Sequence, residues 1–326
     1  MIFLWSNIVL LLISLLCLLF IKKLPFNFII YDKPDKIRKI HTSPIPLIGG
    51  GVFYIFLIFN LIFFSQDLNL GFKLLSLLIF LYSFFFILGF IDDKLSLSAS
   101  KKTIYILVIL FLVIPLHDKL IINEIVFRDI DINIDLKQAN IFFTIFSIYF
   151  FYNLVNFSDG ANGITLSLSL FWIIVFISSG SINETYLYTL IAPLVLILLF
   201  NVKNKIFIGN SGSNLLSIFL ASLFILNYNI DKSLKCDEIL ILMFLPAIDA
   251  IRVIFDRIII GNSPLRPDRN HLHHLLLKKF GNNIVFIPYI IMSISPFIFS
   301  IYFNTVIIFI ISLFAYFGTV LFLKRM

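Results

Sequence analysis

Carboxylate side chains suited to phosphate chemistry occur in a few polar segments of an otherwise apolar chain. Asp92 and Asp93 are adjacent, and Asp159 lies in a Gly-flanked turn close to Asn153 and Asn156. Adjacent carboxylates at a helix end repel each other unless a cation is present, and Mg²⁺ prefers oxygen ligands of this kind. The alternative for the Asp pair is a solvated helix end. The polar group around Asp159 would be costly beside lipid, which favours a cavity lining.

A second group combines histidine with basic residues. His271, His273 and His274 follow Asp268 and Arg269. The His-x-His-His spacing lacks a paired Cys or a helical His-Glu-x-x-His arrangement, so zinc is the weaker interpretation. Arginine makes bidentate contacts with phosphate and histidine donates hydrogen bonds, so the group favours phosphate binding. The alternative is a basic loop that attracts lipid headgroups, but this leaves three histidines in four positions unexplained.

Two glycine-rich turns lie in the same polar segments. They are Gly49–Gly51 and Gly209–Gly212, the second of which encloses Asn210. Glycine permits a close backbone approach to an anion, and it also ends helices at membrane edges. Each turn alone is weak evidence for a site.

The composition indicates which class of protein positions these residues. The chain has 326 residues, of which 60% are hydrophobic and 13% charged, with forty Phe. A soluble domain has roughly twice that charged fraction, so soluble, disordered, fibrous and nucleic-acid-binding classes are excluded. The net charge of +7 therefore reflects topology and anionic headgroups. Cys17 and Cys236 form neither a disulfide framework nor a zinc pattern.

Apolar runs near the length of a membrane-crossing helix occur about eleven times. The sequence thus predicts an all-α polytopic integral membrane protein, organised as a single domain over residues 1–326 in the lipid bilayer. The first run carries basic residues after it and no small-residue cleavage site, which indicates a retained anchor. The predicted spans are 2–21, 47–64, 74–91, 103–122, 140–155, 164–180, 186–200, 212–230, 237–255, 284–302 and 304–323.

Basic residues predict the orientation, because Lys and Arg in short loops stay cytoplasmic. All but six of the 25 basic residues follow odd-numbered spans, which predicts an outside N-terminus and a cytoplasmic C-terminus. The polar segments 32–51, 89–102, 153–165, 207–214 and 263–274 then share the cytoplasmic face. On the other face, alternating Ile and Asp in 123–137 predict a small external hairpin. The six exceptions are Lys73, Lys119, Arg128, Lys137, Lys232 and Lys235.

These five segments resemble the polyprenyl-phosphate N-acetylhexosamine-1-phosphate transferase superfamily, which is glycosyltransferase family 4 and includes phospho-N-acetylmuramoyl-pentapeptide transferase. The resemblance covers most of the chain. The last segment is more similar to the N-acetylglucosamine branch than to the muramoyl-pentapeptide branch. The matching strings, in the family's order, are "DKPDKIRKIHTSPIPLIGG", the Asp-Asp pair, "NFSDGANG", "GNSGS" and "SPLRPDRNHLHH".

The resemblance implies that undecaprenyl phosphate attacks a UDP-N-acetylhexosamine, which gives a sugar-diphospho-undecaprenol and UMP. Magnesium is the implied cofactor, with manganese as the alternative. Such a product initiates a cell-envelope glycan such as O-antigen or teichoic acid, and the implied location is the bacterial cytoplasmic membrane. No nucleic-acid partner is implied. The sequence leaves open whether the chain forms a homodimer.

The resemblance also implies roles for single residues. Asp92 is a candidate base or positioner of the lipid phosphate, with Asp93 and Asp159 as site acids. The candidate catalytic set is completed by His271, His273 and His274. The candidate metal ligands are Asp93, Asp159 and Asn210. The candidate substrate-binding residues are Lys39, His41, Lys102, Asn153, Asn156, Arg266, Asp268 and Arg269.

The chain departs from the family pattern at three positions. Asn210 replaces an Asp that is a magnesium ligand in the family, Asn162 stands where many members have Asp, and Ser96 stands where some have a third Asp. An amide oxygen still coordinates magnesium, but the lost negative charge weakens binding. Asp249 and Asp256 in the ninth predicted span are candidates for a compensating acid.

Two other functions stay open. A polyprenyl-phosphate-binding protein with weakened catalysis would keep the basic loops and lose acidic metal ligands, as at Asn210. A lipid or solute transporter would place its binding residues near the bilayer midplane in related halves of the chain, whereas these residues cluster at one face.

Overall fold

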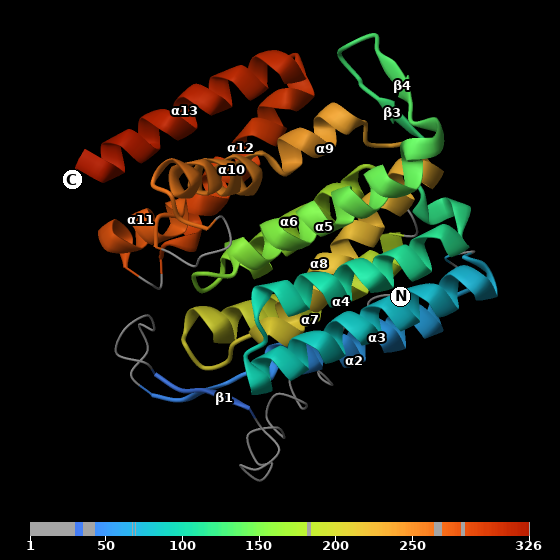
Figure 1. Cartoon of the computed structure of the whole chain (residues 1–326), viewed down its shortest axis with the longest axis horizontal. Coiled ribbons are helices and arrows are strands. Elements are labelled where there is room, and N and C mark those ends of the chain that lie inside the picture. Colours follow the sequence, from blue (N-terminus) through green and yellow to red (C-terminus); the bar gives the residue numbers. More distant parts are fainter. Residues whose placement is uncertain are drawn as a thin grey trace.

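The computed structural model describes residues 30–34, 43–66, 68, 70–180, 184–263, 269–281 and 284–325. In these ranges the chain forms a bundle of helices (Figure 1). The first predicted span, 2–21, lies outside the described residues. The helices are α2 (Gly49–Phe63), α3 (Gly71–Leu95), α4 (Ala99–Val113), α5 (Asn140–Ser158), α6 (Ile164–Ser178), α7 (Glu184–Val202), α8 (Gly209–Leu226), α9 (Cys236–Leu242), α10 (Phe244–Ile259), α11 (Leu272–Phe280), α12 (Phe286–Tyr302) and α13 (Thr305–Arg325).

In the described part of the chain, six helical segments are long and apolar enough to cross a membrane. They are Gly71–Leu95, Ala99–Leu116, Lys137–Ser158, Thr185–Val202, Gly209–Asp231 and Thr305–Arg325. Three shorter apolar helices, α2, α6 and α12, lie among them. The prediction of a polytopic helical membrane protein is confirmed, while the number of eleven spans and the orientation stay predictions.

Two short antiparallel sheets lie at opposite ends of the bundle (Figure 1). β3 (Glu124–Val126) pairs with β4 (Asn133–Asp135), which confirms the hairpin predicted for 123–137. β1 (Tyr31–Asp32) pairs with β2 (Ile45–Pro46) just before α2. This second pair was not predicted, because two-residue strands leave no periodic signal.

Helix α8 is the centre of the bundle. Within its membrane-length segment 83% of the apolar window is buried, against 22% for α4 and for α13. Every residue from Ser211 to Leu226 is buried. A helix that is buried all round must still satisfy its polar side chains. On α8, Ser217 Oγ donates to the carbonyl of Ser213 in the same helix at 2.6 Å, while Asn214 Oδ1 accepts from the Tyr152 hydroxyl of α5 at 2.7 Å.

The ninth predicted span is not one continuous helix, because the chain breaks between α9 and α10. Pro246 has no N–H, so the carbonyl of Leu242 loses its normal helical partner. The indole Nε1 of the buried Trp172 donates to this carbonyl at 3.1 Å. Trp172 thereby stabilises the break and anchors it to α6.

Glycines bring α2 and α3 close to the start of α8. A Cβ at Gly212 would lie 2.8 Å from the Cα of Gly50, and a Cβ at Gly50 would overlap the Gly212 backbone. A Cβ at Gly89 on α3 would overlap the Asn210 carbonyl group. Gly50, Gly89 and Gly212 therefore permit helix–helix contact, since only a residue without a side chain fits at these positions.

We expect Gly50→Ala to lower the free energy of unfolding by about 1–3 kcal/mol, because the added methyl forces two backbones apart. The matched control is Gly51→Ala in the same helix, where an added Cβ meets nothing within 4 Å. That substitution should raise helix stability by roughly 0.5–1 kcal/mol. Thermal unfolding in detergent measures both, and equal effects would contradict the close-packing explanation.

Candidate active site

The predicted polar segments meet at one end of the bundle. The N–H groups of Gly49 and Gly50 donate to the carbonyls of Phe207 and Ile208 at 3.0 and 3.1 Å, and Phe207 N–H donates to Pro46 at 3.0 Å. The start of α2 and the segment before α8 are thus joined by backbone hydrogen bonds. This contact confirms that segments about 160 residues apart share one face, as expected for loops after odd-numbered spans.

The carboxylate of Asp93, at the end of α3, caps the N-terminus of α8. Its Oδ1 accepts hydrogen bonds from the backbone N–H of Asn210 at 2.8 Å and from Asn210 Nδ2 at 3.0 Å. Its Oδ2 accepts from the backbone N–H of Ser211 at 3.0 Å. A carboxylate at a helix N-terminus satisfies orphan N–H groups and interacts favourably with the helix dipole. An Asp at 210 would add a second negative charge here, whereas Asn210 donates a hydrogen bond.

Asp92 has a different partner from Asp93. It is buried, and its Oδ2 lies 2.7 Å from Lys102 Nζ while its Oδ1 accepts from Leu97 N–H at 2.8 Å. Ser96 ends α3 in the left-handed conformation, with φ 52°, and turns the chain into α4. This turn brings Lys102 back over Asp92. The structure therefore joins two residues that the resemblance had placed in the same site.

Asp159 begins the turn between α5 and α6. The turn is fixed by Asn201, whose Oδ1 accepts from Gly163 N–H at 2.7 Å, and by Asn162, whose Nδ2 donates to Asn204 Oδ1 at 2.7 Å. Part of the Asp159 side chain is exposed at the surface. Desolvation by the protein around its buried part, together with the negative charge of Asp93, raises the pKa of Asp159 to about 8.

The two asparagines that precede Asp159 differ in their contacts. Asn153 donates to the Tyr149 carbonyl of its own helix at 2.8 Å. Asn156 donates to the Tyr152 carbonyl at 2.9 Å and lies 3.5 Å from Ser217 Oγ on α8. Asn156 therefore belongs to a polar seam between α5 and α8, beneath the Asp159 turn.

The three histidines lie at the start of α11, which the sequence had predicted as loop. His271 Nδ1 lies 2.8 Å from Asp249 Oδ2 on α10. The ring of His273 stacks on that of His271, with centroids 5.5 Å apart, and is also next to His274 at 4.2 Å. His273 is 1% exposed, and neither ring nitrogen has a hydrogen-bond partner among the described residues. His274 is half-buried.

His273 connects the histidine group to the Asp159 turn. A Cβ added at Gly160 would overlap the His273 ring. Gly160 thus accommodates the ring without a gap, and the buried imidazole is directed at the residue next to Asp159. His273 is packed against protein, and His271 is buried between Asp249 and Arg257, so the half-buried His274 is the best placed of the three to contact a ligand.

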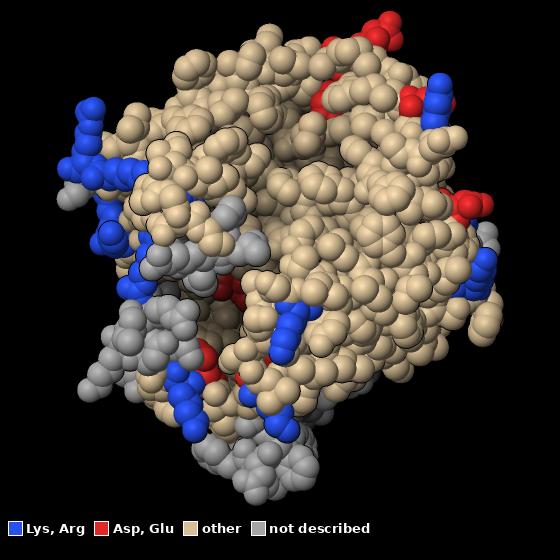
Figure 2. Space-filling view, in the orientation of Figure 1, with Lys and Arg blue, Asp and Glu red and all other residues tan. Residues whose placement is uncertain are grey.

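The remaining predicted residues are only in part described. Arg269 is exposed beside the histidine segment. Lys39, His41, Arg266 and Asp268 lie outside the described residues. Figure 2 shows Lys and Arg side chains along the left and lower edges of the molecule, around a recess in which acidic atoms are visible. This is the end where Figure 1 places α11, β1 and the C-terminus.

Sequence reasoning missed a network of buried polar side chains behind the histidines. Arg252 Nη2 donates to Asp249 Oδ1 at 2.9 Å, and its Nε donates to Tyr316 at 2.6 Å. Asp256 pairs with Arg252 at 3.0 Å and lies 3.5 Å from Lys324. Asp249 and Asp256 are therefore committed to basic partners and do not compensate for Asn210. The available signal was an Asp and an Arg three residues apart in an apolar helix.

No three His, Cys, Asp or Glu side chains among the described residues gather closely enough to hold a metal ion between them. Magnesium needs fewer protein ligands, because substrate phosphates and water complete its shell. The donors present are oxygens: the carboxylates of Asp93 and Asp159, with the buried Thr165 Oγ1, which has no hydrogen-bond partner, at the start of α6. Two interacting carboxylates and an all-oxygen donor set fit a hard divalent cation better than a soft one.

Comparison with known proteins relates this chain to membrane-bound glycosyl transferases. Residues 74–227 match the model of glycosyl transferase family 4, and this match, together with the curated relatives, confirms the resemblance expected from the motifs. The chain is similar to the undecaprenyl-phosphate alpha-N-acetylglucosaminyl 1-phosphate transferase of Thermotoga maritima, with 26% identity over 85% of this chain and 81% of the relative. It is also similar to the protein of that name from Escherichia coli K12, with 24% identity over 82% and 74%.

We expect Lys102→Met to lower the free energy of unfolding by about 1–3 kcal/mol, because the buried Asp92 would lose its countercharge. Lys101→Met is the matched control, since Lys101 is the exposed neighbour of Lys102 in the first turn of α4. The control should change stability by less than about 0.5 kcal/mol. Thermal unfolding in one detergent compares the variants, and an equal loss in both would show that the Asp92–Lys102 pair is unimportant.

Proposed function

We propose that this chain transfers N-acetylhexosamine 1-phosphate from a UDP-sugar to undecaprenyl phosphate and releases UMP. The observation that carries the proposal is the meeting of Asp93, Asp159, the Asp92–Lys102 pair and the histidine segment at one end of a membrane bundle. The names of the relatives favour UDP-N-acetylglucosamine as donor and undecaprenyl phosphate as acceptor. The location proposed is the cytoplasmic membrane of a bacterium, with the site on the cytoplasmic side.

The chemistry exchanges one phosphoanhydride bond for another. An oxygen of the lipid phosphate attacks the β-phosphorus of the UDP-sugar, and the bond to the α-phosphate breaks, so UMP leaves with the electron pair. Such transfers depend on positioning and on stabilising negative charge. Lys102 and the basic residues around the recess supply positive charge, while Asp92, held by Lys102, positions the attacking lipid phosphate.

Magnesium, with manganese as the alternative, is the cofactor we propose. Asp93 and Asp159 would hold it together with the substrate phosphates, and Asn210 would leave the site with one negative charge fewer than the family pattern has. When bound, the cation offsets the charge of the diphosphate. The hydrogen bond from Asn210 to Asp93 keeps Asp93 oriented without a second carboxylate.

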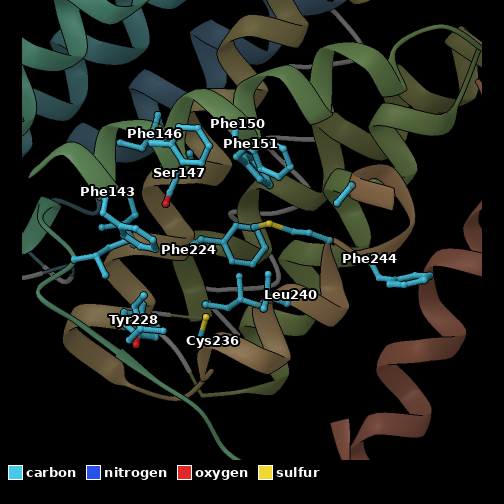
Figure 3. A pocket seen from close by; sticks show the side chains of 18 of the residues that line it. Phe143, Phe146, Ser147, Phe150, Phe151, Phe224, Tyr228, Cys236, Leu240 and Phe244 are labelled. Carbon is cyan, nitrogen blue, oxygen red and sulfur yellow. The ribbon is translucent and has the colours of Figure 1, made fainter. Parts of the chain in front are cut away.

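An apolar pocket supports a long hydrocarbon substrate. Its volume is about 380 Å³, and its lining is almost wholly apolar. Figure 3 shows Phe143, Phe146 and Phe150 of α5 on one side and Phe224 of α8 with Leu240 of α9 on the other. The same α5 ends at Asp159, and the same α8 begins beside Asp93. A polyprenyl tail in this pocket would lie along helices that carry site residues at their ends.

One observation favours a second candidate, a polyprenyl-phosphate-binding protein without turnover. Asp93 and Asn210 satisfy each other by a hydrogen bond of 3.0 Å, which lowers the need for a cation. This candidate keeps the pocket and the basic recess but needs no magnesium.

The first test is release of UMP by the purified protein from undecaprenyl phosphate and UDP-N-acetylglucosamine or UDP-N-acetylgalactosamine, with and without magnesium. We expect magnesium-dependent release, and we expect Asn210→Asp to reach half-maximal activity at a lower magnesium concentration, because it restores a charge. Silence from the native protein with activity in Asn210→Asp would identify a weakened enzyme. Silence from both, with retained binding of the lipid phosphate, would support the binding protein.

We expect Asp159→Asn to lower kcat by roughly 100-fold or more, because it removes the carboxylate at the mouth of the site. The control is Asp131→Asn, which removes one exposed carboxylate from the hairpin at the other end of the bundle. Its turnover should match the native protein. Initial UMP release and thermal unfolding are measured on both variants, and full turnover in Asp159→Asn would remove Asp159 from the site.

A further inference from the structure

The carboxylate of Asp249 on α10 forms hydrogen bonds with the start of α11. Its Oδ2 serves one partner, His271 Nδ1, at 2.8 Å. Its Oδ1 accepts from the backbone N–H of Leu272 at 2.9 Å, from Arg252 at 2.9 Å and from Tyr316 at 2.8 Å. The carboxylate therefore holds both the first N–H of α11 and the ring of the residue before it.

These contacts select the proton position on His271. A carboxylate that accepts hydrogen bonds from Leu272 N–H, Arg252 and Tyr316 is ionised and only accepts, so His271 Nδ1 must carry a proton. On the other side of the ring, Nε2 lies 3.5 Å from Arg257 Nη2, which only donates. In a neutral imidazole Nε2 is then the acceptor. Two separate contacts thus favour the same tautomer.

His271 contacts residues of the proposed site, so its fixed orientation affects how they are placed. Its ring lies 5.6 Å from the ring of Phe157, two residues before Asp159. The His271 ring also stacks on the ring of His273, and the two rings are parallel to within 7°. His273 in turn packs against Gly160. The orientation of His271 therefore decides how the histidine segment lies on the Asp159–Gly160 turn.

We propose that Asp249 is a positioning residue, which fixes His271 with its proton on Nδ1 and so holds the histidine segment against the Asp159 turn. Only the expected effect on kcat rests on the proposed transferase function, because the tautomer of His271 is measured without turnover. Asp249 itself is buried, as are its hydrogen-bond partners His271, Leu272, Arg252 and Tyr316.

Asp249→Asn is the decisive variant, because it keeps the shape of the side chain. The amide oxygen can retain the donors that Oδ1 accepts, but the amide nitrogen then donates to His271 Nδ1. The ring proton must move to Nε2, where it opposes the donor Arg257. We expect kcat to fall roughly 10- to 100-fold with a smaller change in KM, as for other residues that orient a histidine.

The matched control is Tyr316→Phe. It removes one donor from Asp249 Oδ1 and leaves the contact of Oδ2 with His271 unchanged. Its stability should fall as in Asp249→Asn, whereas the tautomer and kcat should stay native. In a His271→Asn background, Asp249→Asn should cause no further loss of kcat, because the two residues act as a unit.

Nitrogen-15 NMR of histidine-labelled protein, with His271→Asn to assign the signal, reads the tautomer directly. The expected result is an Nδ1-protonated His271 in the native protein and an Nε2-protonated ring in Asp249→Asn. An Nε2-protonated ring in the native protein, or native kcat in a folded Asp249→Asn, would overturn the inference. A native protein without transferase activity would overturn the proposed function instead, and the native tautomer would still decide the role of Asp249.

Discussion

The site depends on the close approach of the start of α8 to the backbones of α2 and α3. Gly50, Gly89 and Gly212 remove the side chains that would hold these helices apart. Once they are in contact, Asp93 reaches the free N–H groups of Asn210 and Ser211. A buried helix start needs partners for these groups, because no water satisfies them inside the bundle. The same carboxylate is thus a structural cap and a candidate ligand of the site.

Around this contact the polar residues form two layers. Asp92 and Asp159 lie at the ends of α3 and α5, which pack against α8, and Lys102 near the start of α4 pairs with Asp92. Behind the histidine segment, Asp249, Arg252 and Tyr316 form a satisfied buried network, in which each charge has a countercharge or a hydrogen bond. Buried polar groups are tolerated only when satisfied in this way, and a satisfied network holds one arrangement of side chains. The break between α9 and α10 obeys the same rule. Pro246 leaves the Leu242 carbonyl without its helical donor, and Trp172 donates a hydrogen bond to it.

Asn210 illustrates how one substitution changes the balance of a site. In the family pattern expected from the motifs this position is an acid, and a second carboxylate beside Asp93 would call for a cation. Here the amide donates to Asp93, so the pair is stable by itself. In the proposed transferase, Asp159 and the substrate phosphates would supply the negative charge that position 210 lacks. The transferase and the binding protein are therefore separated by how strongly magnesium is required.

The sequence by itself determined the class of the protein, because apolar runs of membrane length and basic loops act locally along the chain. The hairpin within 123–137 followed from alternating Ile and Asp, and Asp92, Asp93 and Asp159 followed from residue type and motif. Only the tertiary structure decided the partners: Lys102 for Asp92, Asn210 for Asp93 and Gly160 for His273. It also decided that the glycine turns are helix contacts and that Asp249 belongs to His271. These pairings join residues far apart in the chain, and spacing along the sequence contains no information about which helix faces meet.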